Sequence, residues 1–283
     1  MTGRRGVNPT VRRRRLGAEL RRYREAAGLT IDQVAERLEC SASKISRLET
    51  GQTGSSPRDV RDILAIYGVG ESELESLLEV ARETRQRGWW QPYGSVLTSA
   101  FIGFEAEAKL IRSYEAQCVP ELLQTDEYAR ALMTAGGEDG PEQIDNRVRL
   151  RMVRQEIITH EDPVEFWCVL DEAALMRPVG GRPALQRQLE HLATTAELPN
   201  VRLQVLPLEI GAHAGMDGSF VLLSFPHESD PDTVYVTIAT GGVFQEKPDE
   251  ISRYAAIFDR LQQAALSPED SAALINRMAK ETL

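Results

Sequence analysis

Apolar residues in the first third of the chain recur every three or four positions, which predicts a series of short amphipathic helices. Two of these lie within residues 29–51. The apolar stripe of the first consists of Ile31, Val34, Ala35 and Leu38. Thr30 stands before this stripe with Gln33 three positions on, a pattern typical of a capping box. We therefore expect a capped helix that begins at about residue 31.

The second helix of this pair has one apolar and one polar side. Ser41 is expected to cap it, and Ile45 and Leu48 face the partner helix. The polar side carries Ser43, Ser46, Arg47 and Thr50 at helical spacing. A short helix that is held by a partner and presents a guanidinium outwards has the form of a helix-turn-helix recognition helix.

Three further helices complete an all-α domain. The first helix of the chain is expected over residues 13–27 and ends at Gly28. The fourth begins after Ser56, with Pro57 in its first turn. The fifth has an apolar stripe within residues 74–81. Five helices of this length form a small helical domain around one core.

The net charge of −10 is unevenly distributed along the chain. Residues 1–58 hold 13 Lys and Arg against 6 Asp and Glu, a net charge of +7. The remaining 225 residues hold 20 against 37, a net charge of −17. A basic segment attracts phosphate and an acidic one repels it, so only the N-terminal part is expected to approach DNA.

The segments 24–30, 34–35 and 41–51 together resemble the helix-turn-helix of XRE-type, lambda-repressor-like transcriptional regulators. The resemblance covers about residues 13–70 and implies a DNA-binding domain, which we place over residues 13–87, with double-stranded DNA as its partner. It implies a recognition helix over about residues 42–50 in the major groove. A homodimer is expected, because one such helix contacts only a few base pairs.

The same resemblance implies roles for single residues. Ala42, Ser43 and Arg47 would face base edges, with Ser46 beside them. Lys44 would meet phosphate, and so would the loop backbone at Gln52 and Thr53. Arg24 and Glu49 match a structural ion pair between the first helix and the end of the third.

Two residues depart from the resembled pattern. Ile31 stands where a glutamine often reaches a phosphate and braces the recognition helix, so that contact is missing or replaced. Glu39 stands where the turn usually has glycine. If the backbone at Glu39 has a positive φ, a residue other than glycine costs about 1 kcal/mol.

Arg47 is expected to carry most of the base recognition. Its guanidinium can bond to both O6 and N7 of guanine, which discriminates by roughly 1–3 kcal/mol. The alternative is a surface arginine paired with a nearby carboxylate. Residues 1–12 are interpreted as a disordered basic arm, which either contacts phosphate or the minor groove or is only a solvated tail.

The pattern changes beyond residue 88, where we place the domain boundary. Strands are predicted at 164–170, 201–206, 220–225 and 234–238, with a short fifth at 243–245. Helices are predicted at 105–114, 125–136, 141–158, 183–197, 249–265 and 268–280. These elements predict an α+β domain over residues 88–283 in which helices cover a mixed sheet.

Two features of this second domain have alternative interpretations. Trp89 and Trp90 are expected to insert into its core, the alternative being a surface on which bases stack. The predicted helix over residues 141–158 carries four arginines, at positions 147, 149, 151 and 154. Neighbouring carboxylates favour a salt-bridged surface over a second DNA contact.

Segments such as YEAQCVPELLQTDEYARALM and VLPLEIGAHAGMDGSFVLLSFP resemble the C-terminal domain of a large actinobacterial group of XRE regulators. That resemblance implies a transcription factor, often paired with a small acidic or basic protein encoded nearby, in an antitoxin-like or developmental arrangement. It assigns no chemistry to single residues.

Residues 211–218, GAHAGMDG, place His213 and Asp217 between two predicted strands. One interpretation is a ligand-binding or catalytic loop, with Asp171 or Glu172 taking part. The preferred one is a glycine-rich turn whose polar groups satisfy the backbone, because no nucleophile spacing and no second histidine accompany it.

Three hypotheses follow for the whole chain. It is a regulator whose second domain binds an effector or dimerises, an antitoxin-like protein whose second domain holds a partner protein, or an enzyme fused to a DNA-binding domain. We expect the first, with no enzymatic activity, no cofactor and no metal. Three separated cysteines and the lack of a membrane-spanning apolar run are typical of a cytoplasmic protein.

Overall fold

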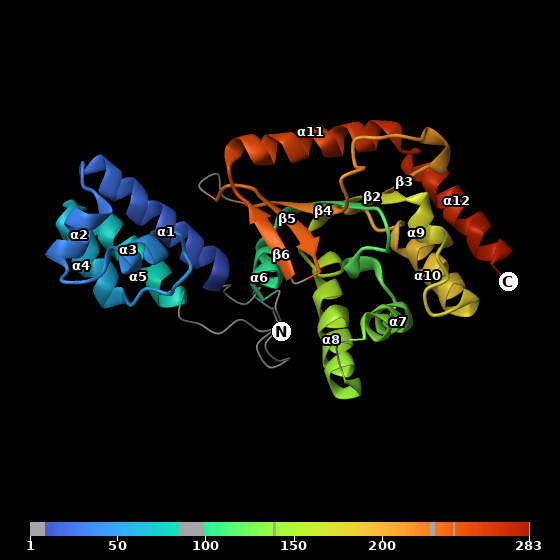
Figure 1. The fold of residues 1–283 in the computed structure, drawn as a ribbon, viewed down its shortest axis with the longest axis horizontal. Coiled ribbons are helices and arrows are strands. Elements are labelled where there is room, and N and C mark those ends of the chain that lie inside the picture. Colours follow the sequence, from blue (N-terminus) through green and yellow to red (C-terminus); the bar gives the residue numbers. More distant parts are fainter. Residues whose placement is uncertain (1–8, 85–98, 138–139, 227–229, 240, 283) are drawn as a thin grey trace. The chain divides into compact units, whose positions relative to one another are not determined.

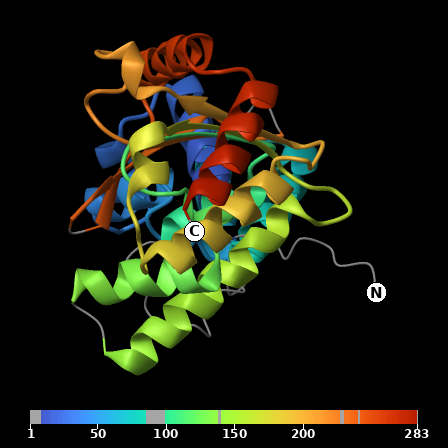
Figure 2. The same cartoon turned by 90° about the vertical axis from the view of Figure 1, so that its right-hand side faces the viewer.

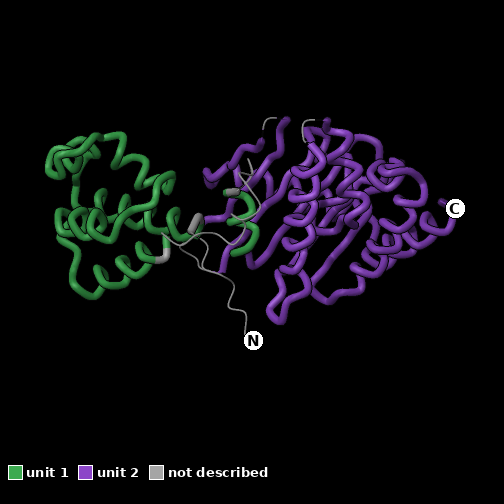
Figure 3. The backbone as a smooth tube through the Cα atoms, turned by 90° about the horizontal axis from the view of Figure 1, so that it is seen from below, with its two compact units in different colours: residues 1–92, 99–107, 227–230 green, residues 93–98, 108–226, 231–283 purple. Residues whose placement is uncertain are grey.

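The computed structural model describes residues 9–84, 99–137, 140–226, 230–239 and 241–282 (Figure 1). The chain divides into two compact units, coloured separately in Figure 3. One is helical, and the other contains a mixed sheet with helices, so the predicted all-α and α+β classes are confirmed. The expected boundary near residue 88, with Trp89 and Trp90, lies outside the described residues, as do residues 1–8 of the expected arm.

The first unit consists of α1 (Pro9–Ala26), α2 (Ile31–Arg37), α3 (Ala42–Glu49), α4 (Pro57–Tyr67), α5 (Glu71–Glu83) and α6 (Ser99–Glu107). Helix α1 begins four residues earlier than the predicted start at Arg13, so residues 9–12 are helical and do not belong to an arm. Val11 is buried and extends the apolar side of α1 by one turn. Proline is well suited to the first turn of a helix, which fits a start at Pro9.

The caps that the sequence predicts for α2, α3 and α4 are present. Thr30 Oγ1 accepts the backbone N–H of Gln33, and the Gln33 side chain accepts the N–H of Thr30, which completes the capping box. Ser41 and Ser56 cap α3 and α4 by the same kind of side-chain contact. These contacts fix where α2, α3 and α4 begin.

Helix α6 is grouped with the first unit although it follows the expected boundary. It contacts α1, and the guanidinium of Arg14 lies 5.5 Å from the centroid of the Phe104 ring. A cation over an aromatic face is attracted by the ring quadrupole. The first unit therefore includes a helix that is distant in sequence from the five predicted ones.

The second unit is built on a six-stranded sheet of order β3-β2-β1-β4-β5-β6. Its strands are β1 (Leu110–Glu115), β2 (Glu165–Asp171), β3 (Val201–Leu206), β4 (Phe220–Ser224), β5 (Thr233–Ile238) and β6 (Gly241–Gln245). Strands β1, β2 and β3 are parallel, while β4, β5 and β6 continue the sheet in antiparallel pairs. The five strands that the sequence predicts correspond to β2 through β6.

Helices cover both faces of this sheet. They are η2 (Glu121–Leu123), α7 (Asp126–Gly136), α8 (Pro141–Arg154), η3 (Gln155–Ile158), α9 (Glu172–Met176), α10 (Arg182–Thr195), η4 (Leu208–Ile210), α11 (Pro248–Ala264) and α12 (Pro268–Glu281). Figure 1 shows α11 on one face and α7, α8 and α10 on the other. Figure 2 shows α12 beside α10, and α12 also contacts the edge strand β3.

The apolar core under α11 joins residues from five strands. Phe258 and Leu261 of α11 are fully buried against Tyr114, Leu222 and Val234. Alternate residues of a strand point to opposite faces, so Ser113 and Glu115, the neighbours of Tyr114 on β1, face α7 and α8. Ser113 and Glu115 thus lie among the buried apolar residues of that second face, such as Ile111 and Phe166.

The predicted helix over residues 105–114 is wrong. Helix α6 ends at Glu107, and β1 follows from Leu110. The segment pairs in parallel with β2 on one side and in antiparallel with β4 on the other, so it is an interior strand that joins the parallel and antiparallel parts of the sheet. Pairing on two edges overrides the local helical pattern, since strand formation depends on context more than helix formation does.

The turn between α2 and α3 is strained at Glu39, whose φ is +50°. Glycine at this position should raise the free energy of unfolding of the first unit by about 0.5–1 kcal/mol, because it adopts a positive φ without steric cost. Amide hydrogen exchange in α2 and α3 measures this change. Glu39→Ala is the matched control, since it removes the same exposed side chain but keeps Cβ, and it should give no gain. Equal stabilisation by both variants would contradict strain as the cause.

Candidate nucleic-acid interface

The recognition helix α3 is held to α1 by a buried ion pair. Arg24 Nε and Nη2 donate to the two carboxylate oxygens of Glu49 at 2.7 and 3.0 Å. The side chains are only 11% and 5% exposed. Arg24 Nη1 also donates to the carbonyl of Leu29 at 2.8 Å, which joins the start of α2 to the same group. One guanidinium therefore connects all three helices, in a two-point geometry that fixes orientation as well as distance.

A close backbone approach fixes the same junction. A Cβ atom at Gly17 of α1 would lie 2.5 Å from the carbonyl oxygen of Glu49 and 2.6 Å from that of Leu48. Only glycine allows α1 to lie so close to the end of α3. Gly51 then ends α3 with a φ of +67°, a conformation that glycine adopts readily.

The outward face of α3 carries the side chains that the sequence assigns to base contact. Arg47 and Ser43 are exposed, and among the described residues neither side chain has a hydrogen bond or ion pair. Ser46 and Ala42 are half-buried and lie toward the core of the unit. Arg47 is thus available to an external acceptor, and the alternative of a paired surface arginine does not describe it.

The groups expected to meet phosphate already have hydrogen-bond or ion-pair partners within the first unit. Lys44 Nζ lies 2.9 Å from Asp59 Oδ1, and Asp59 also accepts a hydrogen bond from the Ser56 hydroxyl. The N–H groups of Gln52 and Thr53 donate to the carbonyl of Arg47 at 3.0 and 3.4 Å. These two amides therefore bond to the end of α3 in the free protein, and the contact of this loop with phosphate stays a prediction. Their side chains remain exposed or half-exposed.

The loop over residues 211–218 brings one of its two predicted residues into a polar cluster. His213 Nε2 lies 3.7 Å from Asp171 Oδ2, and the Tyr114 hydroxyl lies 3.5 Å from the same oxygen. The His213 Nδ1 accepts the N–H of Gly215. Asp217 is exposed and lies outside this cluster. Asp171 also caps α9 by accepting the N–H of Ala173, so the cluster ties the loop to the ends of β1 and β2.

On the opposite face of the sheet, two carboxyl groups have contrasting environments. Burial raises the pKa of Glu115 to about 7, with only Ser113 and Ser219 as hydrogen-bond donors. Burial also disfavours the Glu121 carboxylate, but Arg151 and Arg154 outweigh that effect and lower its pKa to about 2. The sequence prediction that the arginines of α8 form salt bridges holds for these two.

Comparison with protein families gave two matches. Residues 15–77 match the model described as "Helix-turn-helix domain", which covers α2 and α3. Residues 98–277 match the model described as "Domain of unknown function (DUF5753)". Neither the curated proteins nor the solved structures gave a match. Within the described residues, no helix combines the length and apolarity needed to cross a bilayer, and no group of three or more His, Cys, Asp or Glu is placed to hold a metal ion.

The fold, the exposed face of α3 and the first match define a helix-turn-helix DNA-binding protein of the kind that regulates transcription. The second match covers more than half of the chain, which therefore belongs to the DUF5753 family.

Three of the residues described above were not predicted from the sequence. Asp59 was not recognised as the partner of Lys44, and Tyr114 was assigned to the wrongly predicted helix over residues 105–114. Glu115 directly follows that predicted helix and was placed in no strand. A strand prediction at residues 110–115 would have placed both Tyr114 and Glu115 at the carboxyl end of a central strand, where sites in α/β sheets commonly form.

Glu49→Gln should destabilise the first unit by about 2–4 kcal/mol, because it leaves the buried Arg24 guanidinium without a countercharge. Amide hydrogen exchange in α1 and α3 measures the loss. Glu79→Gln is the control, because Glu79 is exposed and pairs with Arg82 at the surface of α5, away from Arg24. A loss for Glu49→Gln no larger than that of the control would show that the pair does not hold α3.

Glu115 should make the second unit less stable as pH rises from about 4.5 to about 7. Its pKa is higher in the folded than in the unfolded chain, so folding retains a proton in this window and loses that advantage above it. Glu115→Gln should remove this decrease in the free energy of unfolding, which urea unfolding at a series of pH values measures. The separate decrease below about pH 4.5 should remain, because there the Glu121 carboxylate becomes protonated and loses its arginine partners. An unchanged profile in Glu115→Gln would refute the assignment.

Proposed function

We propose that this protein is an XRE-type, sequence-specific transcriptional regulator that binds DNA as a homodimer and is modulated through its second unit. The observation that carries the proposal is Arg47, an exposed guanidinium without a partner among the described residues, on a helix fixed by a buried ion pair. An arginine held in this way can bond to guanine without first breaking an internal contact, and the geometry of its helix is set in advance.

The charge distribution supports DNA contact through the first unit. Residues 1–58 carry +7, so binding should release counterions and weaken steeply with salt. Lys44 contributes less to this term than a free lysine would, because phosphate must compete with Asp59 for it. Direct base recognition then depends mainly on Arg47, since Ser43 discriminates weakly and Ala42 offers only a methyl contact.

Dimerisation follows from the size of the recognition element. Helix α3 has eight residues and contacts too few base pairs to select a site in a genome. Two copies on half-sites about one helical turn apart, roughly 34–36 Å, would supply the missing specificity.

A second role is proposed for the second unit as the binding site of a partner protein, in the antitoxin-like arrangement. Large apolar side chains are exposed at Met176, Leu208, Ile210 and Met216. The N–H of Leu208 donates to Glu172 at 2.9 Å, which brings η4, with Leu208 and Ile210, to α9, with Met176; Met216 lies in the loop that follows η4. Exposed apolar residues that gather on one surface favour contact with a protein.

Catalysis is not part of the proposal. His213 Nδ1 accepts the N–H of Gly215 and its Nε2 lies 3.7 Å from Asp171, which supports a role in holding the loop in place. His213→Ala should therefore increase amide hydrogen exchange in residues 211–218 and leave the affinity for DNA unchanged.

Arg47→Ala should lower the affinity for sites selected from a random duplex library by roughly tenfold or more, while affinity for unrelated DNA changes about twofold. Fluorescence anisotropy over a salt series measures both. Arg61→Ala removes the same charge from an exposed position on α4 and serves as the control, with no change in the preferred sequence. If Arg47→Ala keeps full sequence preference, Arg47 is not the base-contacting residue.

Sedimentation of the DNA complex should give two chains per duplex, and one chain would contradict the dimer.

A further inference from the structure

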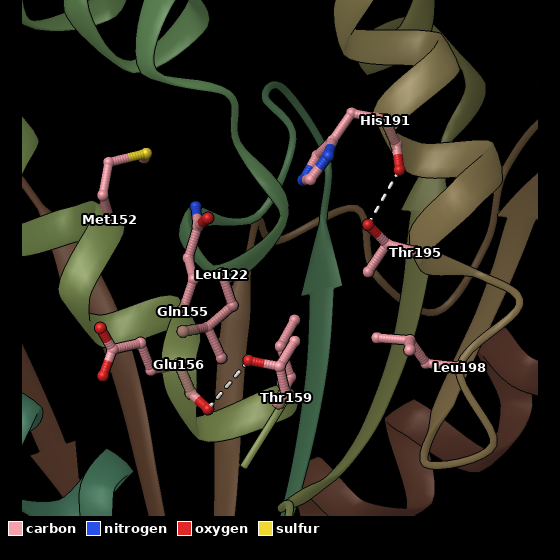
Figure 4. Close-up of a pocket in the computed structure, with 9 residues that line it drawn as sticks. Leu122, Met152, Gln155, Glu156, Thr159, His191, Thr195 and Leu198 are labelled. Carbon is pink, nitrogen blue, oxygen red and sulfur yellow. Dashed lines mark hydrogen bonds between the residues drawn. The ribbon is translucent and has the colours of Figure 1, made fainter.

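The second unit contains a cavity of about 220 Å³ between η2, η3 and α10 (Figure 4). Its apolar lining consists of Leu122, Met152, Ile158 and Leu198. Leu122 and Ile158 are buried, so they form its floor. An engineered apolar cavity of roughly 150 Å³ holds benzene. By volume this cavity, which is open to solvent on one side, has room for one ring with a short side chain.

The two threonines that line the cavity offer acceptors and no donors. Thr195 Oγ1 donates to the carbonyl of His191 at 2.8 Å, and Thr159 Oγ1 donates to the carbonyl of Glu156 at 3.3 Å, as the dashed lines in Figure 4 show. Each hydroxyl has a single hydrogen, which these bonds use. Only the oxygen lone pairs are left for a ligand.

The side chain of Gln155 also offers an acceptor and no free donor. Its amide nitrogen donates to the carbonyls of Glu121 and Gln124 at 3.0 and 2.7 Å, so both amide hydrogens are used. The amide oxygen is the part that remains for a ligand. The polar lining thus lacks donors at three of its five polar residues.

The remaining two polar residues favour a cation. Glu156 supplies a carboxylate, and the residues that line the cavity include no lysine or arginine. Among the described residues, His160 Nε2 lies 3.9 Å from the Glu156 carboxylate, which is 60% exposed at the rim. Figure 4 shows the His191 ring directed into the cavity. Burial lowers the pKa of His191, so the ring is neutral near pH 7 and can accept a hydrogen bond.

We propose that this cavity binds a small molecule with an apolar, ring-sized body and a protonated amine. The body would lie against Leu122 and Ile158, and the amine would donate to the lone pairs at the rim beside Glu156. Anionic ligands of the same shape would bind more weakly, because the carboxylate repels them and few hydrogen-bond donors line the cavity. Binding at this site is independent of DNA, whereas any effect of the ligand on DNA affinity rests on the proposed function.

The test uses the full chain and 2-phenylethylammonium as the probe, with 3-phenylpropanoate and 2-phenylethanol as anionic and neutral analogues. Binding is followed through the methyl resonance of Met152, which lines the cavity, and that of Met216, which lies on another surface. The ammonium probe should shift Met152 saturably and leave Met216 unchanged. The anion should bind about tenfold more weakly or not at all.

Two matched variants test whether the Glu156 carboxylate causes the preference for the ammonium probe. Glu156→Gln should weaken binding of the ammonium probe about threefold to fivefold and leave 2-phenylethanol unchanged, as expected for a partly exposed charge contact. Glu165→Gln removes the same charge at an exposed position on β2 and should behave as the parent chain does. Equal binding of the anion, no response of Met152 to the ammonium probe, or no effect of Glu156→Gln would each overturn the proposal. If Met152 responds while specific DNA affinity stays constant, the site stands and regulation through it fails.

Discussion

The contact on which the DNA-binding unit depends is the buried pair between Arg24 and Glu49. Helix α3 has only eight residues, too few to be stable alone in water. Its position is therefore set from outside, by this pair and by the close approach of α1 at Gly17. Because both charges are buried, each needs the other, and the geometry of α3 is tied to the integrity of α1.

The internal ion pairs of the first unit also decide which charged side chains near α3 remain available to a ligand. Near α3, Arg24 is committed to Glu49 and Lys44 to Asp59, while the Arg47 side chain has no partner among the described residues. A cation that is already paired contributes less to DNA binding, because phosphate only replaces an existing contact. The internal ion pairs thus concentrate base recognition in one side chain.

Local patterns predicted those parts of the structure that depend on neighbours in sequence. The caps at Thr30, Ser41 and Ser56 and the positive φ at Glu39 follow from a few adjacent residues, and all are present. Strand β1 was missed because its identity depends on two partner strands more than 50 residues away. Lys44–Asp59 and Tyr114–Asp171 were missed for the same reason, since folding and not spacing brings them together.

The sheet of the second unit explains why its two polar sites are separate. Tyr114 faces α11, so the cluster with Asp171 and His213 lies on that side of the sheet. The cavity is lined from η2, η3 and α10, which belong to the opposite face (Figure 1). The two sites are also separated along the strands. The cluster lies at the carboxyl ends of β1 and β2. Ile158 and Leu198 of the cavity instead precede the amino ends of β2 and β3, where the Asn200 side chain donates to the carbonyls of Ile158 and Val164.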